Sequence, residues 1–407
     1  MAKFLFVVPP FFGHISPTLS VGATLLQRGH KVVWTGLQPL APHHIPEGGV
    51  WITPEEELAP HREAIARVLK RQDDGPNISG AEALKLALEE TYAPFCRWMM
   101  PGVSRIADNF QPDVIVSDCI TWAGAICAYS KGIPYATTTP VPPGIVGEEM
   151  LETPKINAWQ NALITGLQQE FGIYTDAHIV NSPQLNIVFT SAEFAGCTKP
   201  PPHMQFTGPV KGRPNNAPFD WDKLAAMPSP KVYASIGTLL VNIRKEFFSK
   251  LVTAFGNTPV TIVAATHPGI MEEWPSNFIV QDFVPQSAVM AQMDAVICHG
   301  GFNTVNDTFL HGLPMIITPI AYDQFHTASL IERAGCGIKL RYKRLRIPDL
   351  QQALHNVLHN PQYRLAAQRI RETYINAGGN DAAVFHLEQF AAANKTSTHL
   401  TNANSHI

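Results

Sequence analysis

The chain has 407 residues, of which 45% are hydrophobic and 15% charged, and its formal net charge is -3. This composition is typical of an ordinary globular protein. The length exceeds the usual limit for one hydrophobic core, so we expect two domains of roughly 200 residues each. A near-neutral charge also argues against nucleic-acid binding, which normally requires a basic face.

Cysteine usage and the apolar runs indicate a cytoplasmic protein. The six cysteines are dispersed without a Cys-x-x-Cys pair, which favours reduced thiols. The apolar run 4–8 is ended by Pro9 and Pro10 too early for a signal peptide. No run of about 18 or more apolar residues follows, so we expect no transmembrane helix and at most peripheral membrane contact.

Short apolar or β-branched runs alternate with helical patterns through the first half of the chain, as in βαβ units with a parallel sheet. The first run is apolar throughout, which predicts a strand buried on both faces. The expected strands are 4–8, 31–35, 113–117, 135–139 and 185–190, and the expected helices are 17–28, 82–90 and 122–130.

The second half repeats this rhythm after a proline-rich stretch, so the sequence predicts an α/β protein with two Rossmann-like domains. Its expected strands are 231–237, 259–265, 278–284, 295–298, 314–319 and 337–341. The predicted organisation is an N-terminal domain (1–212), a linker (213–230), a C-terminal domain (231–378), a helix returning to the N-terminal domain (379–393) and a disordered tail (394–407).

Gly13 and His14 lie in the turn after the first strand, at the carboxyl edge of the predicted sheet, where ligands of such sheets bind. Imidazole titrates near neutral pH and can remove the proton of an attacking hydroxyl. Such a base needs a carboxylate to hold its tautomer. Asp118 is the better candidate because it ends the strand 113–117 on the same side, whereas Asp113 is interpreted as a strand-entry residue.

The most informative segment runs from residue 283 to 328. The apolar run 295–298 delivers His299, Gly300 and Gly301 to the start of a helix, whose free N–H groups and positive dipole end suit a diphosphate. Asp323 and Gln324 follow the next strand, where they can bind sugar hydroxyls.

The order and spacing of this segment resemble the C-terminal donor motif of the UDP-glycosyltransferases, and the Gly13-His14 turn resembles that family's catalytic turn. The resemblance implies the GT-B architecture, in which two Rossmann-like domains face one cleft. It implies His14 as the catalytic base and Asp118 as its partner. The implied donor-binding residues are Gly237, Thr238, Phe283, Val284, Gln286, His299, Gly301, Asn303, Thr304, Asp307, Asp323 and Gln324.

Two positions depart from the family pattern. Phe283 stands where a tryptophan most often stacks on the nucleobase. Asp307 stands where a glutamate usually binds the ribose hydroxyls, and its shorter side chain has less reach.

The resemblance implies an inverting transfer of a hexose from a nucleotide-diphosphate sugar, UDP-glucose, to a hydroxyl of a small lipophilic acceptor. Polyketides, flavonoids and carotenoids or other terpenoids are the implied acceptor classes, as in the macrolide and zeaxanthin glycosyltransferase branches. We see no metal-binding pattern of His, Cys and carboxylates, so we expect no cofactor and no metal. The candidate acceptor residues are Phe11, Phe12, Trp122 and Met150.

An NAD-dependent oxidoreductase is disfavoured because the first turn lacks Gly-x-Gly-x-x-Gly and no acidic residue ends the second strand. Two alternatives stay open. One is another GT-B protein, such as a sugar-nucleotide epimerase, and the other is a non-catalytic glycosyltransferase-like binding partner.

Overall fold

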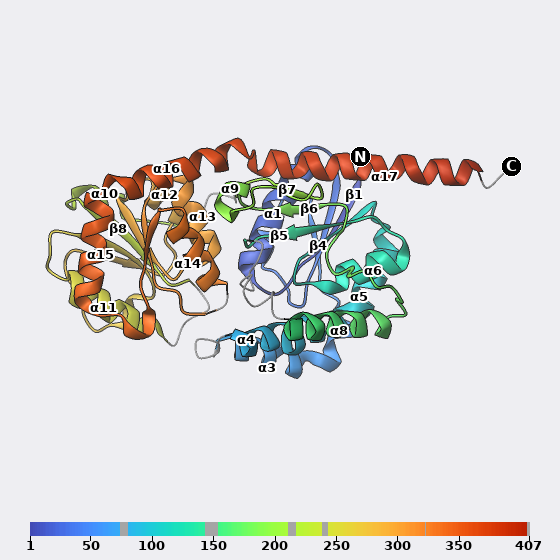
Figure 1. Cartoon of the computed structure of the whole chain (residues 1–407), viewed down its shortest axis with the longest axis horizontal. Helices are drawn as coiled ribbons and strands as arrows, with labels where there is room; N and C mark the ends of the chain where they lie inside the picture. Colours follow the sequence, from blue (N-terminus) through green and yellow to red (C-terminus); the bar gives the residue numbers. More distant parts are fainter. Residues whose placement is uncertain (74–79, 143–153, 211–216, 238–242, 322, 405–407) are drawn as a thin grey trace.

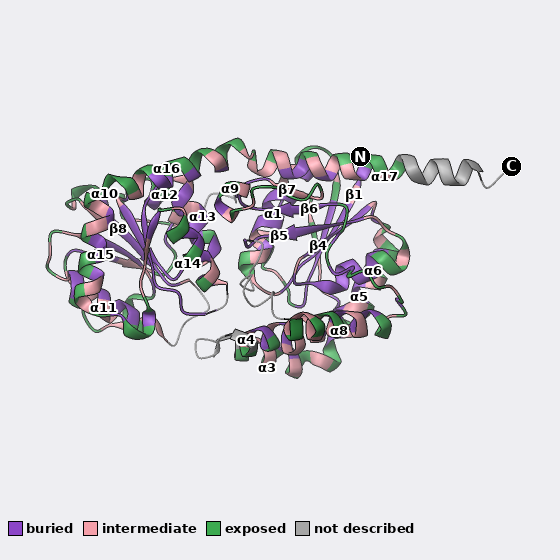
Figure 2. Ribbon diagram, in the orientation of Figure 1, coloured by how far each residue is buried: buried purple, intermediate pink, exposed green. Residues whose placement is uncertain are grey.

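The structure is a computed structural model of the chain, and it describes residues 1–73, 80–142, 154–210, 217–237, 243–321 and 323–404. Each half of the chain builds one parallel β-sheet, and the two sheets lie side by side (Figure 1). The central strands of both sheets are buried, and exposed residues gather on the outer faces of the surrounding helices (Figure 2). The predicted α/β class with two Rossmann-like halves is therefore confirmed.

The N-terminal sheet has seven parallel strands in the order β3-β2-β1-β4-β5-β6-β7. Alternate residues of the first strand enter different cores, Leu5 on one face and Phe6 on the other, which explains its unbroken apolar run. The strand bounds are β1 (Lys3–Val7), β2 (Lys31–Thr35), β3 (Val50–Ile52), β4 (Val114–Asp118), β5 (Tyr135–Thr139), β6 (Asn186–Val188) and β7 (Met204–Phe206).

The C-terminal sheet has six parallel strands in the order β10-β9-β8-β11-β12-β13. Strands β8 and β11 are central neighbours, so the residues that follow them meet at one point of the carboxyl edge. The strand bounds are β8 (Lys231–Ser235), β9 (Thr261–Ala265), β10 (Phe278–Gln281), β11 (Ala295–Cys298), β12 (Met315–Ile317) and β13 (Gly337–Lys339).

Helices cover both sheets. The N-terminal half contains α1 (Phe12–Gln27), α2 (Glu55–Leu58), α3 (Arg62–Asp73), α4 (Gly80–Ala87), α5 (Ala93–Phe110), α6 (Trp122–Lys131), α8 (Pro154–Glu170) and α9 (Ala192–Ala195). The C-terminal half contains α10 (Trp221–Ala226), α11 (Arg244–Phe255), α12 (Gln286–Met290), α13 (Phe302–Leu310), α14 (Gln324–Arg333), α15 (Ile347–His359), α16 (Pro361–Asn376) and α17 (Gly379–Asn404). Shorter helical turns are η1 (Pro42–His44), η2 (Ala59–His61), η4 (Leu88–Tyr92), η6 (Pro268–Ile270) and η7 (Tyr342–Arg344).

Helix α1 begins at Phe12, whereas the sequence predicted a start at Pro17. The N–H of His14 already donates to the carbonyl of Phe11 at 2.9 Å, so the glycine-histidine turn is itself the first helical turn. Pro17 therefore lies inside the helix. Because proline has no N–H, the carbonyl of Gly13, four residues earlier, receives no helical hydrogen bond and is left for another donor.

Two helices occupy segments for which the sequence predicted no helix. Helix α10 lies within 213–230, where the sequence predicted only a linker: the Asp220 side chain accepts from the N–H of Lys223 at 2.9 Å, and Leu224 is fully buried. Helix α17 continues to Asn404, within the segment 394–407 for which the sequence predicts disorder, and that disorder stays a prediction.

Helix α17 crosses back over the N-terminal sheet, along the upper edge of Figure 1. Val384 and Leu387 are fully buried in the core that this sheet shares with α1. Arg28, at the end of α1, forms ion pairs with Asp381 at 2.7 Å and Glu388 at 2.9 Å. The last helix therefore completes the core of the first half of the chain.

Candidate active site

The predicted base and its carboxylate come from neighbouring strands of the N-terminal sheet. Strands β1 and β4 pair in parallel, with Val7 opposite Ser117. His14 follows the first of these strands, and Asp118 ends the second. Parallel pairing places both side chains at the same carboxyl edge.

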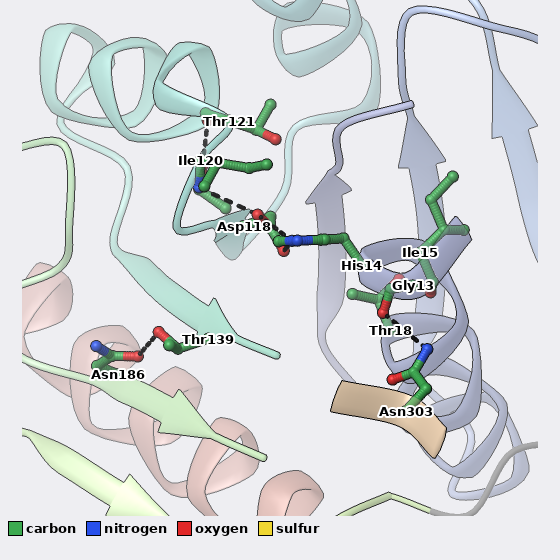
Figure 3. A network of polar contacts seen from close by, with 11 residues as sticks. Gly13, His14, Ile15, Thr18, Asp118, Ile120, Thr121, Thr139, Asn186 and Asn303 are labelled. Atoms are coloured by element: carbon green, nitrogen blue, oxygen red, sulfur yellow. Dashed lines mark hydrogen bonds and ion pairs between the residues drawn. The ribbon is translucent and has the colours of Figure 1, made fainter. Parts of the chain in front are cut away.

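His14 and Asp118 are in direct contact. The imidazole Nδ1 lies 3.1 Å from Oδ1 and 3.0 Å from Oδ2 of the fully buried carboxylate (Figure 3). Asp118 Oδ1 also accepts from the N–H of Ile120 at 3.1 Å, which fixes the carboxylate. A carboxylate acceptor at Nδ1 requires that Nδ1 carry the proton, so Nε2 keeps the lone pair of a base.

The surroundings of His14 raise its pKa above the ordinary 6.5. Burial by itself lowers this pKa, but the charge of Asp118, its hydrogen bond and the charge of Asp323 together outweigh burial. Burial in turn raises the pKa of the Asp323 carboxyl to about 6, although His14 acts in the opposite direction. Asp323, the residue directly before α14 in the second half of the chain, thus interacts electrostatically with His14 in the first half.

His299 lies between two glycines. A Cβ on Gly237 would lie 2.9 Å from the imidazole Nε2, and one on Gly301 would lie 2.5 Å from the same atom. The ring therefore fills the space that side chains would take at both positions. Burial lowers the pKa of His299 to about 4, while the backbone of Ser235 acts to raise it. A neutral imidazole can offer a diphosphate an N–H, not a positive charge.

Helix α13 begins at Phe302, three residues after this histidine. Its N-cap residue, Gly301, makes no side-chain capping hydrogen bond, and no acidic residue lies in the first turn. Thr304 is buried and Asn303 is exposed at the same helix end. Unsatisfied N–H groups and the helix dipole make this end suitable for an anion.

Gln286, Asp307 and Tyr233 form a connected polar group beside that helix end. Gln286 Nε2 donates to Asp307 Oδ2 at 2.6 Å, and the phenol of Tyr233 donates to Gln286 Oε1 at 3.0 Å. Thr304 Oγ1 lies 3.4 Å from the same amide oxygen. Burial raises the pKa of Asp307, whereas the amide of Gln286 lowers it.

The remaining predicted donor residues lie around the same edge. Phe283 exposes 77% of its surface, as an aromatic that is free to stack on a base would, while Val284 is buried. Gln324 Oε1 accepts from the N–H groups of Ile320 and Ala321 at 2.9 and 3.0 Å. The amide oxygen of Gln324 thus holds its own loop.

The aromatic acceptor candidates differ in exposure. Phe12 is half exposed, with its ring centroid 5.0 Å from that of His44, and Phe11 has an edge contact with His14 at 6.2 Å. Trp122 is only 3% exposed and packs against Tyr92, so it supports the site from the core. Thr238 and Met150 lie outside the described residues.

Sequence reasoning missed Arg244 and Cys119. Arg244 Nη2 donates to the carbonyl of Gly237 at 2.9 Å, which places a cation beside the predicted diphosphate turn. Cys119, His14 and Asp118 bring potential metal-ligand atoms within 4.8 Å of one another. Burial raises the pKa of the Cys119 thiol well above its ordinary value, and the carboxylate is already bonded, so these groups suit proton transfer better than metal binding. Arg244 has no sequence signal, because only folding brings it beside Gly237, whereas Cys119 directly follows Asp118 but is part of no recognisable motif.

His14 and Asp118 lie at the edge of one sheet, and the N-terminus of α13 and Asp323 lie at the edge of the other. This arrangement suits group transfer from a phosphorylated donor to a nucleophile. With two parallel-sheet domains, the fold is that of the GT-B glycosyltransferases. The glycotransferase of kitacinnamycin has the same fold, with a TM-score of 0.75 at 21% identity over 96% of this chain and 99% of that one. The spinosyn rhamnosyltransferase SpnG complexed with thymidine diphosphate has a TM-score of 0.71 at 18% identity, over 95% of this chain and 100% of that one.

Sequence comparison identifies the family. The model of the UDP-glucoronosyl and UDP-glucosyl transferases matches residues 201–406. The chain belongs to this family of transferases. The NDP-glycosyltransferase YjiC of Bacillus subtilis (strain 168) is 25% identical over 395 residues, which cover 94% of this chain and 95% of that protein. Within the described ranges, no helix has the length and apolar character needed to cross a membrane.

Proposed function

We propose that this protein transfers a hexose from UDP-glucose to a hydroxyl group of a small lipophilic acceptor, with inversion at the anomeric carbon. The observation that carries the proposal is the contact between His14 Nδ1 and Asp118 at 3.0 Å, at a sheet edge where the charge of Asp323 from the second half of the chain also acts on His14. Family membership supports the transfer, and the site geometry supports the roles of individual residues.

The acceptor hydroxyl loses its proton to Nε2 of His14 as its oxygen attacks the anomeric carbon. The bond between that carbon and the diphosphate oxygen breaks, and its electron pair leaves with the nucleoside diphosphate. Asp118 keeps Nδ1 protonated and stabilises the imidazolium that forms. No covalent enzyme intermediate is needed, because one displacement inverts the configuration.

On the donor side, we assign the base to Phe283, the ribose to Asp307 and the sugar hydroxyls to Asp323 and Gln324. The diphosphate would accept hydrogen bonds from the N-terminus of α13 and from Thr304, with Arg244 adding a positive charge nearby. Fixed donors of this kind offset the charge that develops on the leaving group.

The nucleotide is the least specified part of the donor. Asp307 has a shorter side chain than the family's usual glutamate. SpnG was solved with thymidine diphosphate, which shows that this fold also accepts a deoxynucleotide. We keep uridine as the proposal because the matching family model describes UDP-sugar transferases.

Calorimetric titration of the purified protein with UDP, TDP, GDP and NAD tests the donor class without an acceptor. We expect UDP to bind, and we expect Asp307→Ala to weaken that binding while the exposed control Asp222→Ala leaves it unchanged. Binding of NAD with no response to any nucleoside diphosphate would contradict the proposal. With the donor established, mass spectrometry of reactions with UDP-glucose and a panel of lipophilic alcohols and phenols identifies the acceptor class.

A further inference from the structure

The short helix α9 belongs to the first half of the chain, but its aromatic residue is buried in the core of the second half. Phe194 is 1% exposed, and its ring centroid lies 5.0 Å from that of Phe309 in α13 and 6.2 Å from that of Tyr374 in α16. The chain that leaves β6 is therefore anchored in the C-terminal domain.

Tyr374 connects the segment around α9 to α13, which is called the donor helix because the diphosphate is assigned to its N-terminus. Its buried phenol donates to Asn306 Oδ1 at 2.9 Å, and its oxygen lies 3.2 Å from the hydroxyl of Thr190, which directly follows Phe189 after β6. Since the phenol proton is directed to Asn306, the Thr190 hydroxyl is the donor of the second bond. One phenol thus bonds both to the donor helix and to the N-terminal half.

A second contact joins the same helix to the catalytic turn. Asn303 Nδ2 donates to the carbonyl of Gly13 at 3.4 Å, and this carbonyl is available because Pro17 lacks an N–H (Figure 3). Asn306, one turn further along α13, also approaches the carbonyl of Phe189 with Nδ2 at 3.5 Å. Helix α13 is therefore held against the N-terminal half both beside His14 and at the end of β6.

We propose that Tyr374 is a positioning residue for glycosyl transfer: through Asn306 and Thr190 it sets the donor helix α13 at the correct distance from His14. The inference rests on the function proposed above. The assigned donor residues all lie in the C-terminal half, so the link should not affect how tightly the nucleotide binds. It should affect the rate, because transfer depends on the separation of the acceptor oxygen and the anomeric carbon.

Tyr374→Phe removes only the hydroxyl, and Thr190→Val removes its partner with little change of shape. We expect each variant to lower kcat about 3- to 10-fold, as expected for one lost hydrogen bond, with the calorimetric Kd for UDP unchanged. The double variant should be no slower than the slower single variant, because both remove the same link. The control Tyr135→Phe loses a phenol hydrogen bond of 3.0 Å to Ile179 within the N-terminal domain, and it should keep full kcat.

An unchanged kcat in both single variants would overturn the proposal, and so would an equal loss of kcat in Tyr135→Phe. Weaker UDP binding would also overturn it, because Tyr374 would then support the nucleotide site itself.

Hydrogen exchange separates failure of this proposal from failure of the proposed function. If the parent protein transfers no sugar, the link still predicts faster amide exchange in 186–196 and 302–310 for Tyr374→Phe but not for Tyr135→Phe. Identical exchange in the two variants would overturn the link.

Discussion

The imidazole of His14 lies where burial and charge act on its pKa in opposite directions. Burial favours the neutral ring, whereas the carboxylate of Asp118 in contact and the charge of Asp323 favour the protonated ring, and the result is a raised pKa. A stronger base removes an acceptor proton more readily, provided that the ring is neutral before reaction. The pKa of His14 therefore governs both the rate of the proposed transfer and the dependence of that rate on pH.

His14→Ala should lower kcat/KM by about 10²- to 10⁴-fold, because in the proposed mechanism His14 takes the acceptor proton. The calorimetric Kd for UDP should stay unchanged, since the assigned donor residues lie in the other half of the chain. His178→Ala, an exposed histidine, serves as the control and should retain activity. Full activity in His14→Ala would show that another group is the base.

Asp118→Asn should move the pH profile as well as lower the rate. The base works only when unprotonated, so kcat/KM rises as the pH passes through the pKa of His14, which lies above the ordinary 6.5. Loss of the carboxylate charge lowers this pKa, so the midpoint of the acidic limb should move to lower pH. Steady-state kinetics across about pH 5 to 9 measure it. An unchanged midpoint would mean that Asp118 does not control the charge of His14.

At the scale of elements, the proposed donor site depends on the close approach of two turns at the carboxyl edge of the second sheet, one after β8 and one after β11. His299 occupies the space beside Gly237 and Gly301. Gly300, which lies between His299 and Gly301 in the chain, has φ 90°, a backbone conformation that residues with a side chain rarely adopt. The glycines thus let the ring lie against the backbone at the beginning of α13. A strand-to-helix turn with larger residues would displace the ring or the helix end.

Gly301→Ala should weaken UDP binding by about tenfold or more, which corresponds to about 1.4 kcal/mol. The added Cβ would lie 2.5 Å from His299 Nε2, so the ring or the helix end must shift. Gly166→Ala in α8 is the matched control, because its Cβ would have no neighbour within 4 Å, and it should leave the Kd unchanged. Equal affinity in Gly301→Ala and the parent would remove His299 and the end of α13 from the nucleotide site.

At the scale of the whole molecule, the two halves of the chain exchange elements. Helix α9 of the first half is anchored in the C-terminal core, and α17 at the end of the chain completes the N-terminal core. Each half therefore depends on the other for part of its buried apolar surface. This exchange couples the stability of the N-terminal domain to the last helix.

Leu387→Ala should lower the free energy of unfolding by about 2–5 kcal/mol, because this side chain is fully buried between α17 and the N-terminal sheet. Urea denaturation measures the change. Leu365→Ala in α16, where the side chain is 46% exposed, should cost much less. Equal effects of the two substitutions would mean that α17 contributes little to the N-terminal core.

The sequence pattern predicted the two parallel sheets because a strand that is buried on both faces is apolar at every position. The runs 4–8 and 295–298 have this pattern. Element ends were less accurate. The start of α1 was placed at Pro17 because proline favours helix starts, but a helix also tolerates proline where the freed carbonyl finds another donor. The linker assignment missed α10 because its single buried leucine gives no periodic pattern.

The sequence by itself determined the fold class and the family, since strand-end motifs such as Gly13-His14 and 299–301 are local and their spacing is visible along the chain. Only the tertiary structure decided which other distant groups meet: Asp323 acts on the imidazole of His14, Arg244 lies beside Gly237, and Tyr374 lies between Thr190 and Asn306. The physical reason is that a pKa, a hydrogen bond or a buried contact depends on distance in space, whereas periodicity reports only which face of an element is apolar.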